Sequence, residues 1–114
     1  MTKNYTEITQ DQHQLGSAYR KASPDTMNAF LGLHKAAMAE GVVPKKYKEM
    51  MASAIAIAIR CDGCIASHIK AAVVAGASRE ELVEMINVAV LMGGGPAIIY
   101  GTQALAAVDE FLGK

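Results

Sequence analysis

The sequence predicts an all-α protein of about six helices. Alanine-rich stretches favour helix over strand, apolar residues recur at helical spacing, and Ser, Pro and Gly mark helix starts and stops along the chain. At 114 residues the chain is long enough for one domain, which we place over residues 1–114, and too short for a second core.

The first two expected helices lie in the N-terminal third. Residues 5–21 are polar and only weakly periodic, and we expect a helix there. The second begins at Ser23-Pro24-Asp25, because a capping hydroxyl, a first-turn proline and an acid beside the positive helix end favour a helix start. Gly41 is suited to its C-terminal cap. Its apolar face comprises Met27, Phe30, Leu31, His34 and Met38.

The third expected helix spans about residues 44–60. Within it, residues 53–59 alternate with period two, with Ala at 54, 56 and 58 between Ser53 and Ile at 55, 57 and 59, a pattern that by itself could also be a strand. Alanine is weak in strands and both alternating sets are small or apolar, so a central helix buried on most sides fits better.

Three more helices are expected in the second half. One runs from about residue 62 to 75, with Gly76 as its cap. Ser78 and Glu81 form a capping box that starts the next. The run Gly93-Gly94-Gly95-Pro96 ends that helix, and the last helix covers 97–112.

Composition limits the partners of this chain. Eleven basic and eleven acidic side chains leave no excess charge to attract nucleic acid or an anionic membrane. The longest apolar stretch, 50–59, is far short of a membrane span, and the start has no apolar signal-peptide core. We therefore expect a soluble, cytoplasmic protein. Its apolar fraction of 52% against 19% charged residues indicates a homo-oligomer.

The two cysteines lie in the sequence Cys61-Asp62-Gly63-Cys64, at the expected start of the fourth helix. At this spacing they can form a short-loop disulfide, and a helix N-terminus favours thiolate over thiol. His68 follows Cys64 by four residues, so it lies one turn away on the same face and could take a proton from a thiol. The motif predicts thiol chemistry at this turn.

Two other interpretations of the cysteines stay open on the residues alone. They could be small buried apolar side chains, as most free cysteines are. They could instead bind zinc together with His68 and a fourth ligand from His34, His13 or Glu49.

Glu49 and His34 also have plainer interpretations. Glu49 follows Lys45 by four residues on an expected helix, which is typical of a solvated helical face. Local spacing does not establish a contact between Glu49 and His68, because Glu49 lies farther from the intervening turn. His34, on an apolar stripe, is typical of a core residue, although it could line a pocket in an oligomer.

Glu49, eleven intervening residues, Cys61, two residues, Cys64, three residues and His68 together resemble the signature of the AhpD-like alkylhydroperoxidase and carboxymuconolactone decarboxylase superfamily. The resemblance covers residues 44–111 and is closest to the short single-domain members, which assemble as homotrimers or homohexamers. The chain departs from the prototype at Gly63, where the prototype peroxidase has a histidine.

The resemblance implies a role for each signature residue. In the peroxidase branch, the cysteine matching Cys64 attacks the peroxide and becomes a sulfenic acid, and the cysteine matching Cys61 condenses with it to a disulfide. The residues matching Glu49 and His68 form a proton relay that activates the thiols. A dithiol donor, either lipoyl-bearing or thioredoxin-like, then reduces the disulfide, and no metal or organic cofactor is required.

The expected function is therefore that of a thiol-dependent peroxidase or disulfide reductase acting on a small hydroperoxide or disulfide. One alternative is a carboxymuconolactone decarboxylase-type lyase, a branch that does not depend on a Cys-x-x-Cys pair. Another is a non-enzymatic redox-sensing or zinc-binding module.

Overall fold

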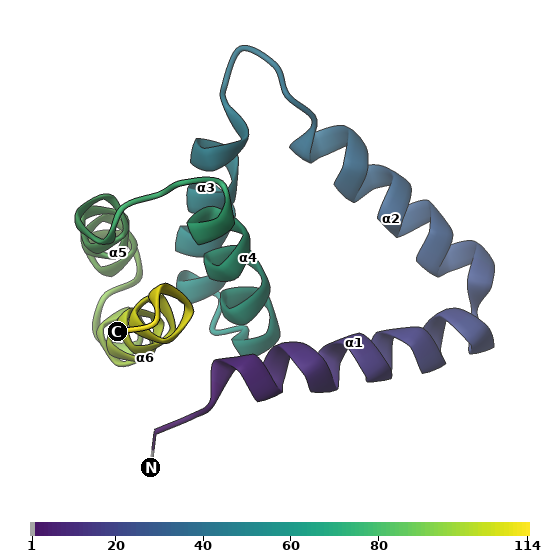
Figure 1. The fold of residues 1–114 in the computed structure, drawn as a ribbon, viewed down its shortest axis with the longest axis horizontal. Coiled ribbons are helices and arrows are strands. Elements are labelled where there is room, and N and C mark those ends of the chain that lie inside the picture. Colours follow the sequence, from purple (N-terminus) through teal and green to yellow (C-terminus); the bar gives the residue numbers. More distant parts are fainter. Residues whose placement is uncertain (1) are drawn as a thin grey trace.

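A computed structural model describes residues 2–114, and over these residues the chain forms six α-helices and no strand (Figure 1). The predicted all-α fold is confirmed. None of these helices combines the length and the apolar character that crossing a membrane requires. The helices are α1 (Tyr5–Ala22), α2 (Pro24–Met38), α3 (Lys45–Ala58), α4 (Asp62–Val74), α5 (Arg79–Gly93) and α6 (Gly95–Leu112).

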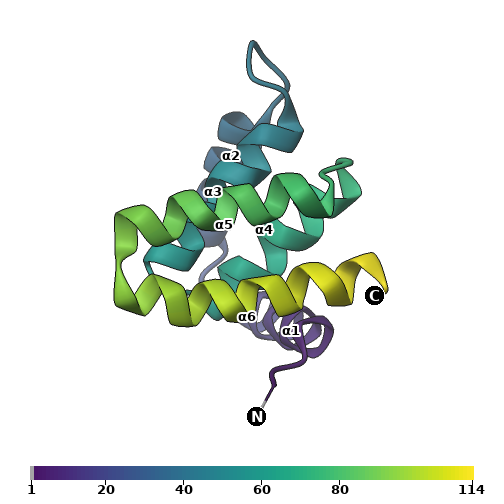
Figure 2. The same cartoon turned by 90° about the vertical axis from the view of Figure 1, so that its left-hand side faces the viewer.

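Helices α3 to α6 pack around the core, and α1 and α2 extend from it as an arm. Consecutive helices α3 and α4 lie side by side, as do α5 and α6, which cross in front of them when the molecule is turned (Figure 2). The first turn of α1 reaches the core through Tyr5, whereas α2 contributes no buried residue. The fully buried side chains with the largest volumes are Tyr5, Ile57, Ile65, Ile69, Leu82, Val108 and Ser53.

Most expected helix ends agree with the structure. Both hydrogen bonds of the capping box between Ser78 and Glu81 form at the start of α5. Helix α6 begins two residues earlier than expected, because a single residue is enough to reverse the chain after α5. That residue is Gly94, whose φ of 68° with ψ of −149° suits only glycine.

The expectation that the third helix is buried on most sides is wrong. Ile57 is fully buried, whereas Ile55 is 60% exposed and Ile59, just after the helix, is 62% exposed. In a helix of 3.6 residues per turn, positions two apart point to nearly opposite sides, so an alternating pattern divides between the core and the outer face. Helix α2 likewise leaves Phe30 and Leu33 exposed. The apolar surface of both helices therefore faces outward in the single chain.

Two ion pairs hold the start of α5 against its neighbours. Lys46 on α3 lies 3.1 Å from a Glu81 carboxylate oxygen, and the Arg79 guanidinium lies 2.7 Å from Asp109 on α6. The backbone amide of Ser78, followed by Lys46, lowers the pKa of Glu81. Hydrogen bonding to Arg79 lowers the pKa of Asp109.

We expect acid to destabilise the fold through these two carboxyls. Because their pKa is lower in the folded chain, they contribute stability above the pKa of an unfolded carboxyl, about 4, and lose it as the pH falls through the folded value. Thermal unfolding followed from pH 7 to pH 2 should show Tm falling in this window. In Glu81→Gln, Tm should be lower at pH 7 and should change less with acid. Glu84→Gln, an exposed acid on the same helix, is the control, and an equal response of both variants would contradict the assignment.

Candidate functional site

The predicted site residues all lie on the α3–α4 hairpin. Glu49 is on α3, Cys61 caps α4, and Cys64 and His68 are on α4. The turn between the helices is centred near Arg60, so Glu49 lies eleven residues before it and His68 eight after it. In antiparallel helices this leaves an axial offset of only about 4.5 Å, which two long side chains can span.

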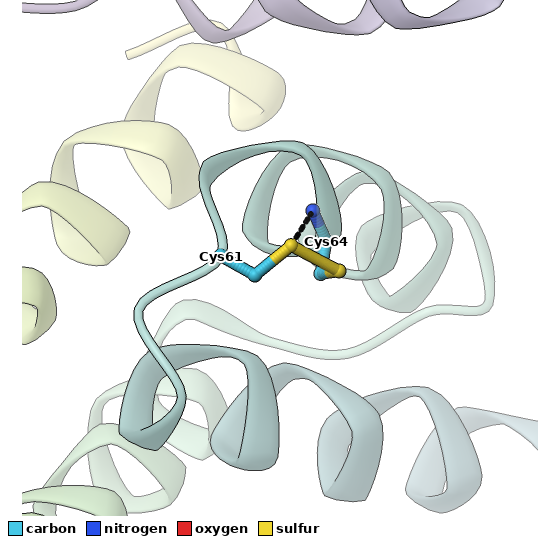
Figure 3. The surroundings of a disulfide bond; sticks show 2 residues. All are labelled: Cys61 and Cys64. Carbon is cyan, nitrogen blue, oxygen red and sulfur yellow. Dashed lines mark hydrogen bonds between the residues drawn. A yellow bond between two sulfur atoms is a disulfide. The ribbon is translucent and has the colours of Figure 1, made fainter. Parts of the chain in front are cut away.

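A disulfide joins Cys61 to Cys64 at the N-terminus of α4 (Figure 3). The two Cα atoms are 5.2 Å apart, and neither cysteine is free. Both residues are half-buried, so the interpretation of free, buried apolar cysteines is wrong. The backbone amide of Cys64 donates to Sγ of Cys61 at 3.3 Å, which makes Cys61 the N-cap of the helix. The positive end of α4 is therefore directed at this sulfur.

Glu49 is buried and holds the imidazole of His68. Its side chain contacts His68 Nδ1 through Oε1 at 2.7 Å, and the residue is only 3% exposed. The interpretation of Glu49 as part of a solvated face is therefore wrong. A buried carboxylate requires a partner. In the tautomer in which His68 donates its Nδ1–H to the Glu49 carboxylate, the other ring nitrogen, Nε2, is a hydrogen-bond acceptor. The His68 imidazole that Glu49 contacts lies one helical turn from Cys64 along α4.

His34 adds a second imidazole beside His68, a residue that the sequence offered only as a candidate zinc ligand or as part of a pocket in an oligomer. Its ring stacks on that of His68 with 6.0 Å between centroids and 21° between planes. His34 is exposed, so its interpretation as a core residue is wrong. It lines a groove of about 470 Å³ between α2 and α3. The position of His34 on an apolar stripe was the only sequence signal for a special role. Spacing along one helix could not show that its ring would stack on His68 of another helix.

The segment that precedes α1 also reaches the cysteine turn, and nothing in the sequence pattern indicated this. Lys3 forms an ion pair with Asp62, which stands between the two cysteines. On α1, Gln12 lies against Gly63, where an added Cβ would be 3.1 Å from Gln12 Cγ. A larger side chain at the position of the prototype's histidine would therefore displace Gln12.

The zinc interpretation finds no support in the geometry. Over residues 2–114, no group of three or more His, Cys, Asp or Glu side chains gathers in a way that could hold a metal ion. His13 lines a separate groove between α1 and α2.

Comparisons with known proteins agree with this fold. Residues 24–109 match the model of the carboxymuconolactone decarboxylase family. An uncharacterized protein of Cupriavidus necator is 39% identical over 104 residues, which is 91% of each chain. Among solved structures, a carboxymuconolactone decarboxylase family protein from Legionella pneumophila in its apo form is 42% identical, with a TM-score of 0.90 over 94% of this chain and 96% of that one.

A second solved structure is more distant. It is a family protein from Thermotoga maritima, for which a part in the antioxidative response has been suggested, and it is 26% identical. It superposes with a TM-score of 0.83 over 94% of this chain and 91% of that one.

We predict that Glu49 controls thiol reactivity through His68. Glu49→Gln keeps the size of the side chain but removes the charge that supports the imidazole as a base. After reduction of the disulfide, alkylation of the thiols by iodoacetamide at pH 7 should slow by about tenfold, which is less than the roughly hundredfold or more that a complete general base contributes, because the imidazole itself is still present. Glu40→Gln, an exposed acid in the loop before α3, is the matched control. Equal rates in the two variants would exclude the role given to Glu49.

Proposed function

The chain belongs to the carboxymuconolactone decarboxylase family, and on this premise we propose that it is a thiol-dependent peroxidase or disulfide reductase that cycles Cys61 and Cys64 between dithiol and disulfide. The observation that carries the proposal is the Cys61–Cys64 disulfide at a helix N-terminus, one turn from the Glu49–His68 pair. The antioxidative role suggested for the Thermotoga maritima relative supports it.

In the oxidative half of the cycle, Cys64 is the nucleophile. His68 takes the thiol proton, and the Cys64 thiolate attacks the terminal oxygen of a hydroperoxide. An S–O bond forms, the O–O bond breaks, and the alcohol leaves after taking a proton. Cys61 then attacks the sulfur of the sulfenic acid, so that the S–S bond forms and water leaves.

In the reductive half, the capped position of Cys61 determines which sulfur leaves. One thiolate of a dithiol donor attacks Cys64 Sγ, the S–S bond breaks, and the electron pair stays on Cys61 Sγ. The Cys64 amide and the positive end of α4 stabilise this leaving thiolate. The second thiol of the donor then attacks the donor sulfur that is bound to Cys64. A disulfide forms within the donor, and Cys64 is released as a thiolate that takes up a proton. A lipoyl-bearing or thioredoxin-like protein supplies such a dithiol, in keeping with a cytoplasmic location, and the cycle uses no metal or organic cofactor.

The two cysteines should respond differently to replacement. Cys64→Ser should abolish consumption of an organic hydroperoxide, because the attacking sulfur is gone. Cys61→Ser should consume one equivalent and stop at a sulfenic acid that dimedone traps and mass spectrometry detects. Equal, partial losses in the two variants would contradict these roles.

The same assay separates the other candidate functions. Decarboxylase activity on a lactone acid that survives Cys64→Ser would favour the lyase, since that chemistry does not use the cysteine pair. Oxidation of the thiols without repeated turnover, whichever donor is supplied, would favour a redox sensor.

We also propose that the chain works as a homotrimer or homohexamer. The outward apolar surface of α2 and α3 supports this, since Phe30, Leu33 and Ile55 are each at least half exposed, at 59%, 63% and 60%. Such a surface is stable in water when a second copy covers it.

A charge placed on this surface should therefore break the assembly. Phe30→Asp should shift the mass measured by light scattering toward that of the 12.0 kDa chain. Thr26→Asp, at an exposed polar position on the same helix, should leave the mass unchanged. A monomeric wild-type protein, or one in which Phe30→Asp changes nothing, would refute the proposed assembly.

A further inference from the structure

Lys3 lies at the cysteine turn although it precedes the first helix. Its Nζ donates to both carboxylate oxygens of Asp62 at 2.9 Å and to Oε1 of Gln103 at 2.6 Å. It also lies 5.3 Å from the ring centroid of Tyr100. The ammonium group is thus held between the first residue of α4 and two residues of α6.

Tyr5 anchors the segment that carries Lys3. The backbone amide of Tyr5 donates to Glu110 Oε2 at 2.8 Å, and its side chain is 1% exposed. Burial, followed by the nearby charge of Asp62, raises the pKa of Tyr5 to about 12.

Asp62 creates an electrostatic conflict in the proposed thiol chemistry. A carboxylate in the first turn stabilises a helix, but here it stands next to Cys61 and competes with a thiolate for the same positive helix end. Because Asp62 directly follows Cys61 in the chain, a negative charge on Asp62 opposes a negative charge on the Cys61 sulfur, even in a partly solvated site.

Few other charged or titratable groups act on the turn. Arg60 directly precedes Cys61, and His68 with Glu49 lies one turn along α4. The Tyr5 phenol lies within the influence of the Asp62 and Glu110 carboxylates, and the Tyr100 ring lies beside the Lys3 ammonium. Over residues 2–114, Lys3 is the one residue that forms an ion pair with Asp62.

We propose that Lys3 is a positioning residue of the thiol site, which neutralises Asp62 and thereby allows the reduced Cys61–Cys64 pair to ionise. The segment before α1 then sets the reactivity of cysteines nearly sixty residues away in sequence. The proposal deepens the proposed function and rests on it for its biological meaning, but it concerns the thiols themselves and can be measured without any peroxide.

The exposure of the ion pair makes this role distinguishable from a structural one. Lys3 and Asp62 are 34% and 38% exposed, and an ion pair this open adds little to stability. Removing Lys3 should therefore change the pH at which the thiols react much more than the temperature at which the protein unfolds.

The test is the pH profile of alkylation of the reduced protein by iodoacetamide, in which a thiolate displaces iodide and forms a C–S bond. In Lys3→Met the pH at which the alkylation rate is half its maximum should be higher than in the wild type, and the alkylation rate at pH 7 should fall about threefold. The equilibrium with glutathione should shift toward the disulfide, because the thiolates are less stable. Lys3→Arg should behave as wild type, and Lys3→Met combined with Asp62→Asn should recover the wild-type rate.

Lys46→Met is the matched control, because it removes a lysine from a different ion pair, the one that joins the first turn of α3 to Glu81. An unchanged alkylation profile in Lys3→Met, whatever its Tm, would overturn the proposal. So would a double variant as slow as Lys3→Met, because the effect would then not pass through Asp62. If the wild type consumes no peroxide but Lys3→Met shifts the profile as described, the proposed function fails and the role of Lys3 stands.

Discussion

The contact between the Glu49 carboxylate and the His68 imidazole is the interaction on which the candidate site depends. It joins α3 to α4 across a short turn, at a place where the helices are otherwise held by alanine and isoleucine side chains. A carboxylate that is 3% exposed is stable there only with a partner. The same contact holds the imidazole in place, so a single pairing accounts both for the burial of Glu49 and for an oriented imidazole one turn from Cys64.

The N-terminus of α4 holds the helix cap, the disulfide and the Asp62–Lys3 ion pair in one turn. Cys61 caps the helix through its sulfur, where many helices use a serine or aspartate oxygen. The donor amide belongs to Cys64, so the partner of the disulfide also stabilises the sulfur that would leave when the disulfide opens. Asp62 strengthens the helix start but opposes a thiolate, and Lys3 resolves this conflict from outside the hairpin. Local geometry and long-range charge act on the same two sulfur atoms.

The arm formed by α1 and α2 connects this site to the outer surface. Gln12 on α1 lies against Gly63 within the cysteine turn, and His34 on α2 stacks on His68. The other side of α2 presents Phe30 and Leu33 to the outside. A second copy that covered these residues would also restrict the arm, so the proposed assembly would act on the environment of the site as well.

The sequence by itself determined the helices and the chemistry of the turn. Propensity, capping and glycine breaks are local, so the positions of all six helices could be predicted from neighbouring residues. The spacing of the two cysteines is equally local, since a separation of three positions at a helix start brings their sulfurs within bonding range. The signature shared with the family indicated Glu49 and His68 before any contact was known. Only the tertiary structure decided that Glu49 is buried against His68, that half of the isoleucines of α3 face outward, and that His34 and Lys3 reach the site. Each of these depends on how helices far apart in sequence pack together, and residue spacing along one helix carries no information about the distance to another.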